Sequence, residues 1–343
     1  MTRVPPAPAA PPPDPPTRTL VDARRSLLLG SGAALLAAAS FAVNGPLSGI
    51  AYDRGMSTLG LVIWRGTCAA LLLGTILALA AARGRPLRYR SLDRRAAVLL
   101  VAAGATGAML NLTVFAAFER TTVALVLITF YTYPAMLAVT GMLLHGERPS
   151  VARVGSLVLA IAGMALVMIS QLDPAEGIRL DLAGLGLAFV AAVCQVVYFT
   201  IGHAGFRSLP ADQATLGVFL VSLPIYAVAA LLGGSGIASV GAPIGDPALM
   251  VVAVLIGTVG AAVPSVLVLT SIRRIGGTRA GIILMFEPVV GVALAALLLG
   301  EAVLPIQVLG GALVIAGGIL LQAVPEREGG EMIVTEDEPA PAL

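Results

Sequence analysis

Charge is scarce in this chain. Only 12% of its 343 residues are Asp, Glu, Lys or Arg, whereas a soluble domain usually carries about 25%. Lysine is absent, so the 21 basic residues are all arginines. Hydrophobic residues make up 58% of the chain, and the mean hydropathy is +0.96. This composition excludes an ordinary soluble domain and indicates an integral membrane protein.

Residues that carry metal, redox or phosphate chemistry are also few. The two cysteines, Cys68 and Cys194, both lie within apolar runs, which argues against a disulfide framework. The two histidines, His145 and His203, have no metal-ligand spacing, and the sequence contains no phosphate-binding P-loop. We therefore expect neither an enzyme nor a cofactor or metal site. The net charge of +2 gives no indication of nucleic-acid binding.

Long apolar runs dominate the sequence instead. A helix needs roughly 20 apolar residues to cross a hydrocarbon core about 30 Å thick. Ten such spans are predicted, at residues 26–50, 57–82, 96–118, 121–144, 151–170, 182–202, 213–233, 247–271, 278–299 and 303–323. Because the connections are short, we expect an all-α integral membrane protein of ten transmembrane helices, without a soluble catalytic domain.

The arginines give these spans an orientation. If the N-terminus is cytoplasmic, 17 arginines fall on the inner side of the membrane. Only Arg54, Arg120 and Arg179 fall on the outer side, and Arg65 lies inside a span. Arginine is enriched in cytoplasmic connections of membrane proteins. The distribution therefore predicts a multi-pass protein of the plasma (cell inner) membrane with both termini cytoplasmic.

The two ends of the chain differ from the spans. Residues 1–25 are crowded with proline and alanine and residues 324–343 are acidic, so both are predicted to be disordered and cytoplasmic. Arg24-Arg25 before an alanine-rich run resembles a twin-arginine or Sec export signal. The apolar run continues through Phe41 to Ile50, whereas the core of a signal spans about 7–15 residues. We expect it to be retained as the first span.

One stretch of the sequence occurs twice. Residues Arg120 to Glu147 and Arg274 to Glu301 each contain an arginine, an apolar run, a central proline and a final Leu-Leu-x-Gly-Glu, at an offset of 154 residues. The same offset relates Ile161-Ala162-Gly163 to Ile315-Ala316-Gly317. Internal duplication of this kind is common in membrane transporters.

The duplication divides the chain into two halves of five spans. The first repeat covers residues 26–170 and the second covers 182–323, with an external linker at 171–181. Because five is an odd number, the second half enters the membrane from the opposite side. The sequence therefore predicts two inverted five-helix repeats.

The duplicated motifs resemble those of EamA-type transporters of the drug/metabolite transporter superfamily. They are Pro134 to Glu147 with Ile161-Ala162-Gly163, and Pro288 to Glu301 with Ile315-Ala316-Gly317. The resemblance covers roughly residues 26 to 323. It implies a carrier of small metabolites, commonly an exporter, with a central cavity lined by the first four helices of each half. It also implies that the fifth and tenth helices are peripheral or at an interface, which leaves a homodimer open.

Two ionisable residues, Glu287 and Arg65, lie inside predicted spans. A charge at the centre of a membrane helix costs about 2.5–3.5 kcal/mol, so each is a candidate site residue. Pro288 has no backbone N–H, so the carbonyl near Leu284 loses its partner and the helix can bend. A carboxylate beside it can bind a cation, a proton or an ammonium group. The alternatives are that the two charges neutralise each other as a structural pair, or that Arg65 extends towards the outer interface.

Polar side chains of the inner spans complete the predicted site. Asn44, Asn111, Tyr133 and Gln195 are candidates for contact with substrate or proton. Their alternative role is interhelical hydrogen bonding, worth about 0.6 kcal/mol each in membranes. We give that role to a looser set, Ser40, Thr129, Tyr131, Tyr198 and Ser265. In the repeat Glu287 takes the place of Tyr133, so the two copies differ where chemistry would be needed.

The repeated residues have structural roles in this interpretation. Pro134 and Pro288 are candidate hinges, because proline disrupts the helix that contains it. Glu147 and Glu301 lie at helix ends, where we expect them to cap, anchor or gate rather than to bind substrate.

Together these features predict a secondary active transporter that works by alternating access. The expected substrates are amino acids or related small metabolites, exchanged for protons, and the expected partners are that substrate and membrane lipids. Export follows from the resemblance alone. A proton/cationic-drug antiporter is one alternative, in which Glu287 holds a proton and a lipophilic cation in turn, although Arg65 would oppose the cation. A membrane scaffold or partner-binding subunit without transport is the other alternative.

Overall fold

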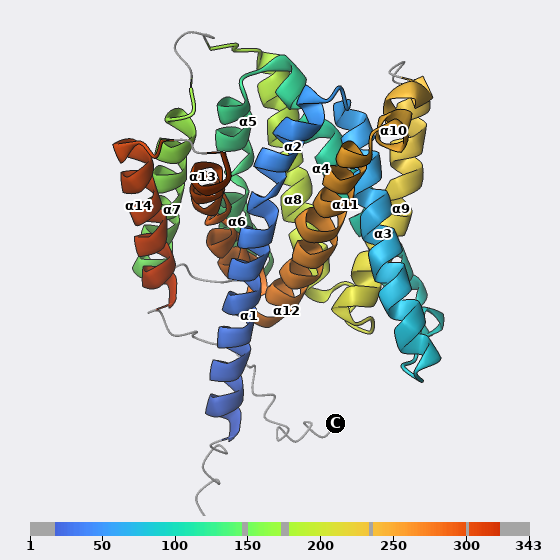
Figure 1. The fold of residues 1–343 in the computed structure, drawn as a ribbon. Coiled ribbons are helices and arrows are strands. Elements are labelled where there is room, and N and C mark those ends of the chain that lie inside the picture. Colours follow the sequence, from blue (N-terminus) through green and yellow to red (C-terminus); the bar gives the residue numbers. More distant parts are fainter. Residues whose placement is uncertain (1–17, 146–149, 173–177, 233–235, 300–301, 323–343) are drawn as a thin grey trace, which may run out of the picture.

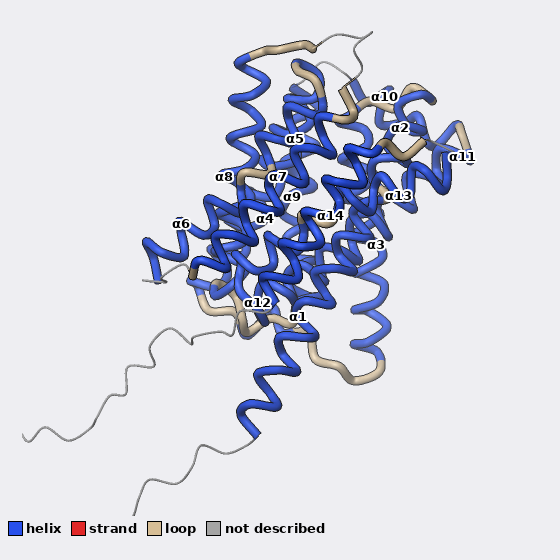
Figure 2. Tube along the Cα trace, turned by 90° about the vertical axis from the view of Figure 1, so that its left-hand side faces the viewer, coloured by secondary structure: helices blue, strands red, loops and turns tan. Residues whose placement is uncertain are grey.

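The computed structural model describes residues 18–145, 150–172, 178–232, 236–299 and 302–322. Within these ranges all regular secondary structure is helical. Figure 1 shows the helices arranged as one bundle, and in Figure 2 the connecting loops gather at its two ends.

The two halves contain similar series of helices. The first half comprises α1 (Arg18–Ala42), α2 (Asn44–Asp53), α3 (Thr58–Ala82), the 3-10 helix η1 (Arg88–Ser91), α4 (Arg94–Arg120), α5 (Val123–Phe130), α6 (Tyr133–His145) and α7 (Val151–Ile169). The second comprises α8 (Leu182–Ala204), α9 (Ala211–Leu232), α10 (Gly236–Gly245), α11 (Pro247–Gly257), the π-helix η2 (Thr258–Ala262), α12 (Val263–Leu284), α13 (Glu287–Leu299) and α14 (Pro305–Gln322).

Polar side chains cap the helices at the ends of the bundle. Ser57 and Asp93 accept hydrogen bonds from backbone amides at the starts of α3 and α4. Asp181 and Asp246 cap α8 and α11 in the same way. The first amides of a helix have no partner within it, so these caps satisfy them and leave the middle of the bundle to apolar residues.

Eight helices in the described ranges are long and apolar enough to cross a membrane. They are Arg24–Asp53, Thr58–Ala82, Arg94–Arg120, Val123–Leu143, Val151–Ile169, Leu182–His203, Ala211–Leu232 and Pro247–Leu284. A shorter apolar helix, Pro305–Leu321, lies where the tenth span is expected. Large apolar side chains such as Leu36, Leu71 and Leu231 are exposed on the outside of the bundle. The chain is thus a multi-pass membrane protein whose apolar surface faces lipid.

The helices are more interrupted than the sequence predicts. The expected ninth span, 278–299, is not one helix, because α12 ends at Leu284 and α13 begins at Glu287. The expected fourth span is divided between α5 and α6. Within α12, Gly276 has a φ of 77° and kinks the helix, a conformation that glycine adopts without a steric penalty. Arg279, expected in an inner connection, is only 4% exposed.

The helical part of the chain also begins earlier than expected. Helix α1 starts at Arg18, so residues 18–25 of the segment predicted to be disordered are helical. Ala34, Ala37 and Ala38 are fully buried, and α1 packs against α12. The segment that resembles an export signal is therefore an integral part of the core.

The internal repeat is visible in the helix boundaries. Helices α6 and α13 both have 13 residues, and their first residues, Tyr133 and Glu287, are 154 positions apart. Contacts repeat as well: Gly30 of α1 packs against Arg274 of α12, and Gly184 of α8 packs against Arg120 of α4. Gly184 lies 154 positions after Gly30, and Arg120 lies 154 positions before Arg274, so the repeat relates the two contacts. The duplication is thus a duplication of structure.

The equivalent helices α7 and α14 run antiparallel to each other. Gly163 packs against Gly310, whereas Gly317, further along α14, packs against Ser156, earlier in α7. A Cβ at either glycine would meet the partner's backbone, so the two helices are in direct backbone contact. Because helices related by the repeat point in opposite directions, the two halves are inverted. The pair lies at the edge of the bundle (Figure 1).

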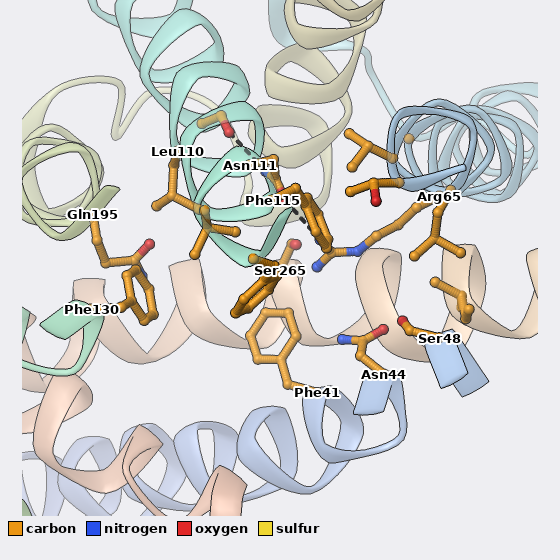
Figure 3. Close-up of a pocket in the computed structure, with 18 of the residues that line it drawn as sticks. Phe41, Asn44, Ser48, Arg65, Leu110, Asn111, Phe115, Phe130, Gln195 and Ser265 are labelled. Atoms are coloured by element: carbon orange, nitrogen blue, oxygen red, sulfur yellow. Dashed lines mark hydrogen bonds between the residues drawn. The ribbon is translucent and has the colours of Figure 1, made fainter. Parts of the chain in front are cut away.

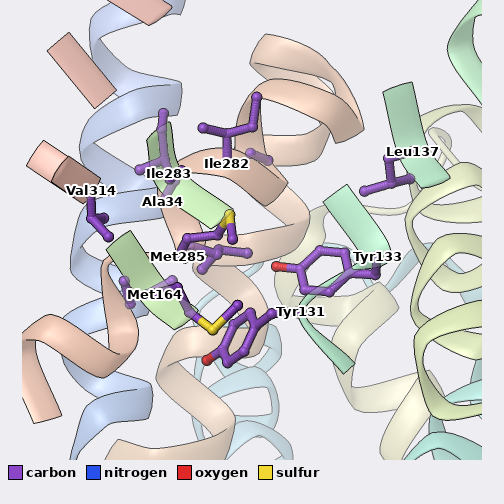
Figure 4. Close-up of a cluster of buried hydrophobic side chains, with 14 of the residues drawn as sticks. Ala34, Tyr131, Tyr133, Leu137, Met164, Ile282, Ile283, Met285 and Val314 are labelled. Atoms are coloured by element: carbon purple, nitrogen blue, oxygen red, sulfur yellow. The ribbon is translucent and has the colours of Figure 1, made fainter. Parts of the chain in front are cut away.

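The largest cluster of buried apolar side chains joins the two halves where their helices are broken. Tyr131 and Tyr133 lie at the junction of α5 and α6, and Met285 lies at the junction of α12 and α13. Figure 4 shows these side chains beside Met164 of α7 and Val314 of α14. The core therefore holds both helix breaks at one level of the bundle.

Candidate functional site

A cavity of about 760 Å³ lies between the two halves. Its lining includes all six side chains predicted to contact substrate or proton, namely Asn44, Arg65, Asn111, Tyr133, Gln195 and Glu287. These residues come from six helices that are widely separated in the sequence. Figure 3 shows one part of the cavity, with Arg65, Asn111 and Asn44 on one side and Gln195 on the other.

Arg65 is held in place by neutral hydrogen-bond acceptors. It is the eighth residue of α3 and lies inside a membrane span, as predicted. Its Nη1 donates to Oδ1 of Asn111 at 2.8 Å and its Nη2 donates to the backbone oxygen of Gly260 at 3.3 Å. The Asn111 amide is oriented in turn by a bond from Nδ2 to the Gly107 oxygen at 2.8 Å. The Nε of Arg65 is buried and has no hydrogen-bond partner.

The Gly260 carbonyl is available because of a local change in helix type. Gly260 lies in η2, the π-helical turn between α11 and α12, and such turns alter the usual pattern of backbone bonding. Its oxygen accepts a second bond from Nδ2 of Asn44 at 3.0 Å. A Cβ at Gly260 would clash with the Asn44 amide, so the glycine lets this amide lie directly against the π-helical turn. The buried Oδ1 of Asn44 has no partner.

Glu287 lies at a helix start, and not inside one continuous helix as the predicted span 278–299 implied. It is the first residue of α13, after the turn formed by Met285 and Phe286. The hydroxyl of Tyr131 is a hydrogen-bonding neighbour of its carboxylate. The proline that follows, Pro288, is favourable in the first turn of a helix because its missing N–H has no helical acceptor there. A carboxylate at this position also interacts favourably with the helix dipole.

Arg65 and Glu287 do not form an ion pair. The three ion pairs between described residues are Arg54–Asp246, Arg85–Asp212 and Arg120–Asp181, all at helix ends. The two cavity charges interact electrostatically, but at more than the 4.0 Å of a direct contact. The alternative that they neutralise each other as a structural pair is therefore not supported. The cavity presents a cation and an anion to whatever occupies it.

Aromatic side chains form one wall of the cavity. Tyr133 stacks edge-on against Phe199 with ring centres 5.6 Å apart, and its hydroxyl donates to the Gly281 oxygen at 3.4 Å. Phe130 packs against both Tyr131 and Tyr133. Tyr133 is almost fully buried, so it closes the wall and offers little surface to a ligand.

The two candidate hinges occupy equivalent places. Pro134 and Pro288 are the second residues of α6 and α13, directly after the helix breaks, and both are buried. Glu147 and Glu301 lie outside the described residues.

Several residues of the cavity were not predicted from the sequence. Tyr226, Tyr52 and Glu119 line it, together with the phenylalanines Phe41, Phe115, Phe118, Phe130 and Phe219. Tyr131, Tyr198 and Ser265, which we interpreted as interhelical hydrogen-bonding residues, line it as well. Glu119 lies beside Arg120, just beyond the end of the predicted span 96–118, where charged residues are common in membrane proteins.

The cavity is open at one end of the bundle and closed at the other. At the mouth end, its lining residues Tyr52, Glu119 and Val123 are exposed. At the opposite end, which carries Arg85 and Arg207 and is called the arginine-rich end below, apolar side chains fill the bundle. Phe199, Phe206, Leu269 and Ile272 are each at most 1% exposed there. The structure is thus a one-sided open conformation.

These features define a class: a multi-pass membrane protein of two inverted helical halves around a central cavity. A family model for the EamA-like transporter family matches the chain twice, over residues 28–169 and 182–322. The chain therefore belongs to the EamA-like transporter family, within the drug/metabolite transporter superfamily. The two matches coincide with the two halves of the structure.

Solved structures confirm the fold. Among the 29 chains that match is one titled only as a crystal structure of a protein, with a TM-score of 0.69 and 19% sequence identity. The match covers 87% of this chain and 97% of the other. A comparison with curated proteins finds no significant match.

Proposed function

We propose that this protein is a secondary active exporter of amino acids or related zwitterionic metabolites, which works by alternating access in exchange for protons. One observation supports the proposal above the others. Arg65 and Glu287 line one cavity without forming an ion pair, so a carboxylate and an ammonium group of one substrate each meet an opposite charge. The guanidinium of Arg65, which lines the cavity, suits a carboxylate.

The proposed cycle uses the inverted halves. We propose ten membrane crossings, with α5–α6 acting as one broken span and the end of α12 with α13 as another. The arginine-rich end faces the cytoplasm, so the described conformation is open to the outside. Glu287 lies at a helix break beside Pro288, where a small change in backbone angle moves the carboxylate relative to the other half. Glu287 releases its proton or its substrate according to the side that is open.

The test is transport by the purified protein in liposomes. A proton gradient is imposed and uptake of pooled amino acids is compared with uptake in liposomes without protein. We expect concentrative movement of at least one zwitterionic compound, abolished by a protonophore. The proposal is wrong if no compound moves, or if movement is unaffected by collapse of the gradient.

A proton/cationic-drug antiporter is the second candidate function. It is favoured by the phenylalanines of the cavity wall, such as Phe41, Phe115 and Phe130, because aromatic faces attract organic cations. Lipophilic cations are therefore tested in the same liposomes. Competition by cations but not by zwitterions would replace the first proposal with this one.

A further inference from the structure

Two turns at opposite ends of the bundle are equivalent in the repeat. At the arginine-rich end, the amide of Leu209 donates to the oxygen of Phe206 at 3.1 Å, after α8. At the mouth end, the amide of Gly55 donates to the oxygen of Tyr52 at 2.8 Å, after α2. Both residues of the first bond are 154 positions beyond those of the second. The same turn therefore occurs at a closed end and at an open end.

Arg273 fastens the turn at the closed end. Its Nη1 donates to the Leu209 oxygen at 2.7 Å and its Nη2 donates to the Phe206 oxygen at 3.2 Å. Its guanidinium carbon also lies 5.5 Å from the centre of the Phe206 ring, a cation–π contact. The turn is thereby bound to α12 and helps to close this end of the cavity.

The equivalent residues at the mouth end are more exposed to solvent than those at the closed end. Tyr52 takes the place of Phe206 and Glu119 takes the place of Arg273, at the same offset of 154. Tyr52 is 38% exposed, whereas Phe206 is 1% exposed. The tyrosine and the glutamate both line the mouth and lie close enough to interact electrostatically. Their chemistry is also complementary, because a tyrosine hydroxyl is a donor and a carboxylate is an acceptor.

The apolar residues next to these turns are also related by the repeat and differ in exposure. Leu269 and Ile272, which are fully buried at the closed end, correspond to Phe115 and Phe118 at the mouth end. Both phenylalanines line the open cavity and stack edge-on with ring centres 5.8 Å apart. The mouth end thus has a residue at each position that closes the arginine-rich end, but the residue types differ.

We propose that Tyr52 and Glu119 form the gate of the mouth end. When that end closes, the turn after α2 moves against the end of α4, the Tyr52 hydroxyl donates to the Glu119 carboxylate, and Phe115 and Phe118 pack beneath them. Tyr52 gives up its present neighbour, the Thr58 side chain. The gate rests on the proposed alternating-access function, because only a cycle that closes the mouth requires it.

Disulfide trapping tests the gate directly. Cys68 and Cys194 are replaced by alanine, and Tyr52→Cys is combined with Glu119→Cys in protein reconstituted in liposomes. We expect oxidation to link the two introduced thiols, to stop transport and to be reversed by a reductant. Disulfides require Cβ atoms about 3.5–4.5 Å apart, so a link shows that the two positions come into direct contact. The matched control, Asp53→Cys with Glu119→Cys, uses an exposed neighbour of Tyr52 and should link much more slowly.

The outcomes separate the gate from the proposed function. If the liposomes transport but no link forms, or if linked protein transports at the full rate, the gate assignment is wrong while the carrier proposal stands. If wild-type protein moves no compound, the carrier proposal fails, and the linking rate still shows whether the mouth closes. The conservative variants Tyr52→Phe and Glu119→Gln should lower the transport rate roughly tenfold, the effect of one charge-assisted hydrogen bond, without weakening substrate binding. Asp53→Asn should change neither.

Discussion

The two halves supply equivalent positions to the cavity but different chemistry. Eight pairs of residues related by the repeat line it from both halves: Phe41 and Gln195, Asn44 and Tyr198, Leu61 and Thr215, Arg65 and Phe219, Asn111 and Ser265, Val114 and Val268, Phe130 and Leu284, and Tyr133 and Glu287. In each pair that contains a charge, the partner is an uncharged aromatic residue. The repeat therefore supplies the shape of the cavity, and departures from the repeat supply its charges. For Arg65 and for Glu287, the residue at the same place in the other half can therefore be substituted as a control.

The largest effect is expected from the pair of Glu287 and Tyr133. Glu287→Gln keeps the shape of the side chain but removes the group that carries proton or ammonium, so proton-driven transport should fall about 100-fold or more. Tyr133→Phe removes only a long hydrogen bond to Gly281 and should change transport little. Proton-coupled uptake in liposomes is the measurement. Equal losses in both variants would show that the site depends on shape rather than on the carboxylate.

The pair of Arg65 and Phe219 is expected to give the next largest effect. Arg65→Lys retains the charge but cannot keep the two bonds to Asn111 and Gly260 while presenting a further donor, because guanidinium and ammonium differ in geometry. We expect the substrate concentration for half-maximal transport to rise roughly tenfold.

Phe219→Leu is the control for Arg65 in the other half. It keeps an apolar side chain at the same place in the repeat, so it should change half-saturation much less. A lysine variant with unchanged half-saturation would remove Arg65 from the substrate site.

The contact between α7 and α14 should affect stability rather than transport chemistry. Gly163→Ala and Gly317→Ala each place a Cβ against the backbone of the opposite helix. Overpacking of this kind typically costs about 1–3 kcal/mol. Gly32→Ala and Gly186→Ala are matched controls, because these glycines are also related by the repeat and a Cβ at either would meet nothing within 4 Å.

Thermal unfolding in detergent measures these glycine variants. We expect the first pair to unfold at lower temperature than the second. Similar unfolding of all four variants would mean that the antiparallel contact contributes little to stability.

Most of the architecture could be predicted from the sequence. Long apolar runs and the repeated motifs predicted the helices and the two inverted halves, and they placed Arg65 correctly in its helix. The prolines Pro134 and Pro288 predicted a bend in the fourth and ninth spans, but the sequence did not predict that each helix ends and a new one begins there. The turn before Glu287 is formed by Met285 and Phe286, two apolar residues that do not themselves indicate the end of a helix.

The site was predicted in part for a related reason. A charge or an amide in an apolar run is conspicuous, so Arg65, Glu287, Asn44 and Asn111 could be found. Tyr226 could not, because an aromatic residue in a membrane helix is ordinary packing until its neighbours are known. Residues as far apart in the sequence as Asn44 on α2 and Glu287 on α13 line one cavity only because of the tertiary fold.

The smallest effect is expected from the aspartates that cap the N-termini of α4 and α11. Asp246 caps α11 and pairs with Arg54 at 2.9 Å, whereas Asp93 caps α4 through the amide of Ala96. The backbone amide of Leu249, together with Arg54, lowers the pKa of Asp246 below its ordinary value of 3.8. A lowered pKa in the folded state means that the contribution to stability is present above that ordinary value and is lost as the pH falls through the folded-state pKa. Asp246→Asn should therefore lower the unfolding temperature slightly at neutral pH, and the difference from wild type should shrink under acid conditions. A difference that grows on acidification would contradict this assignment.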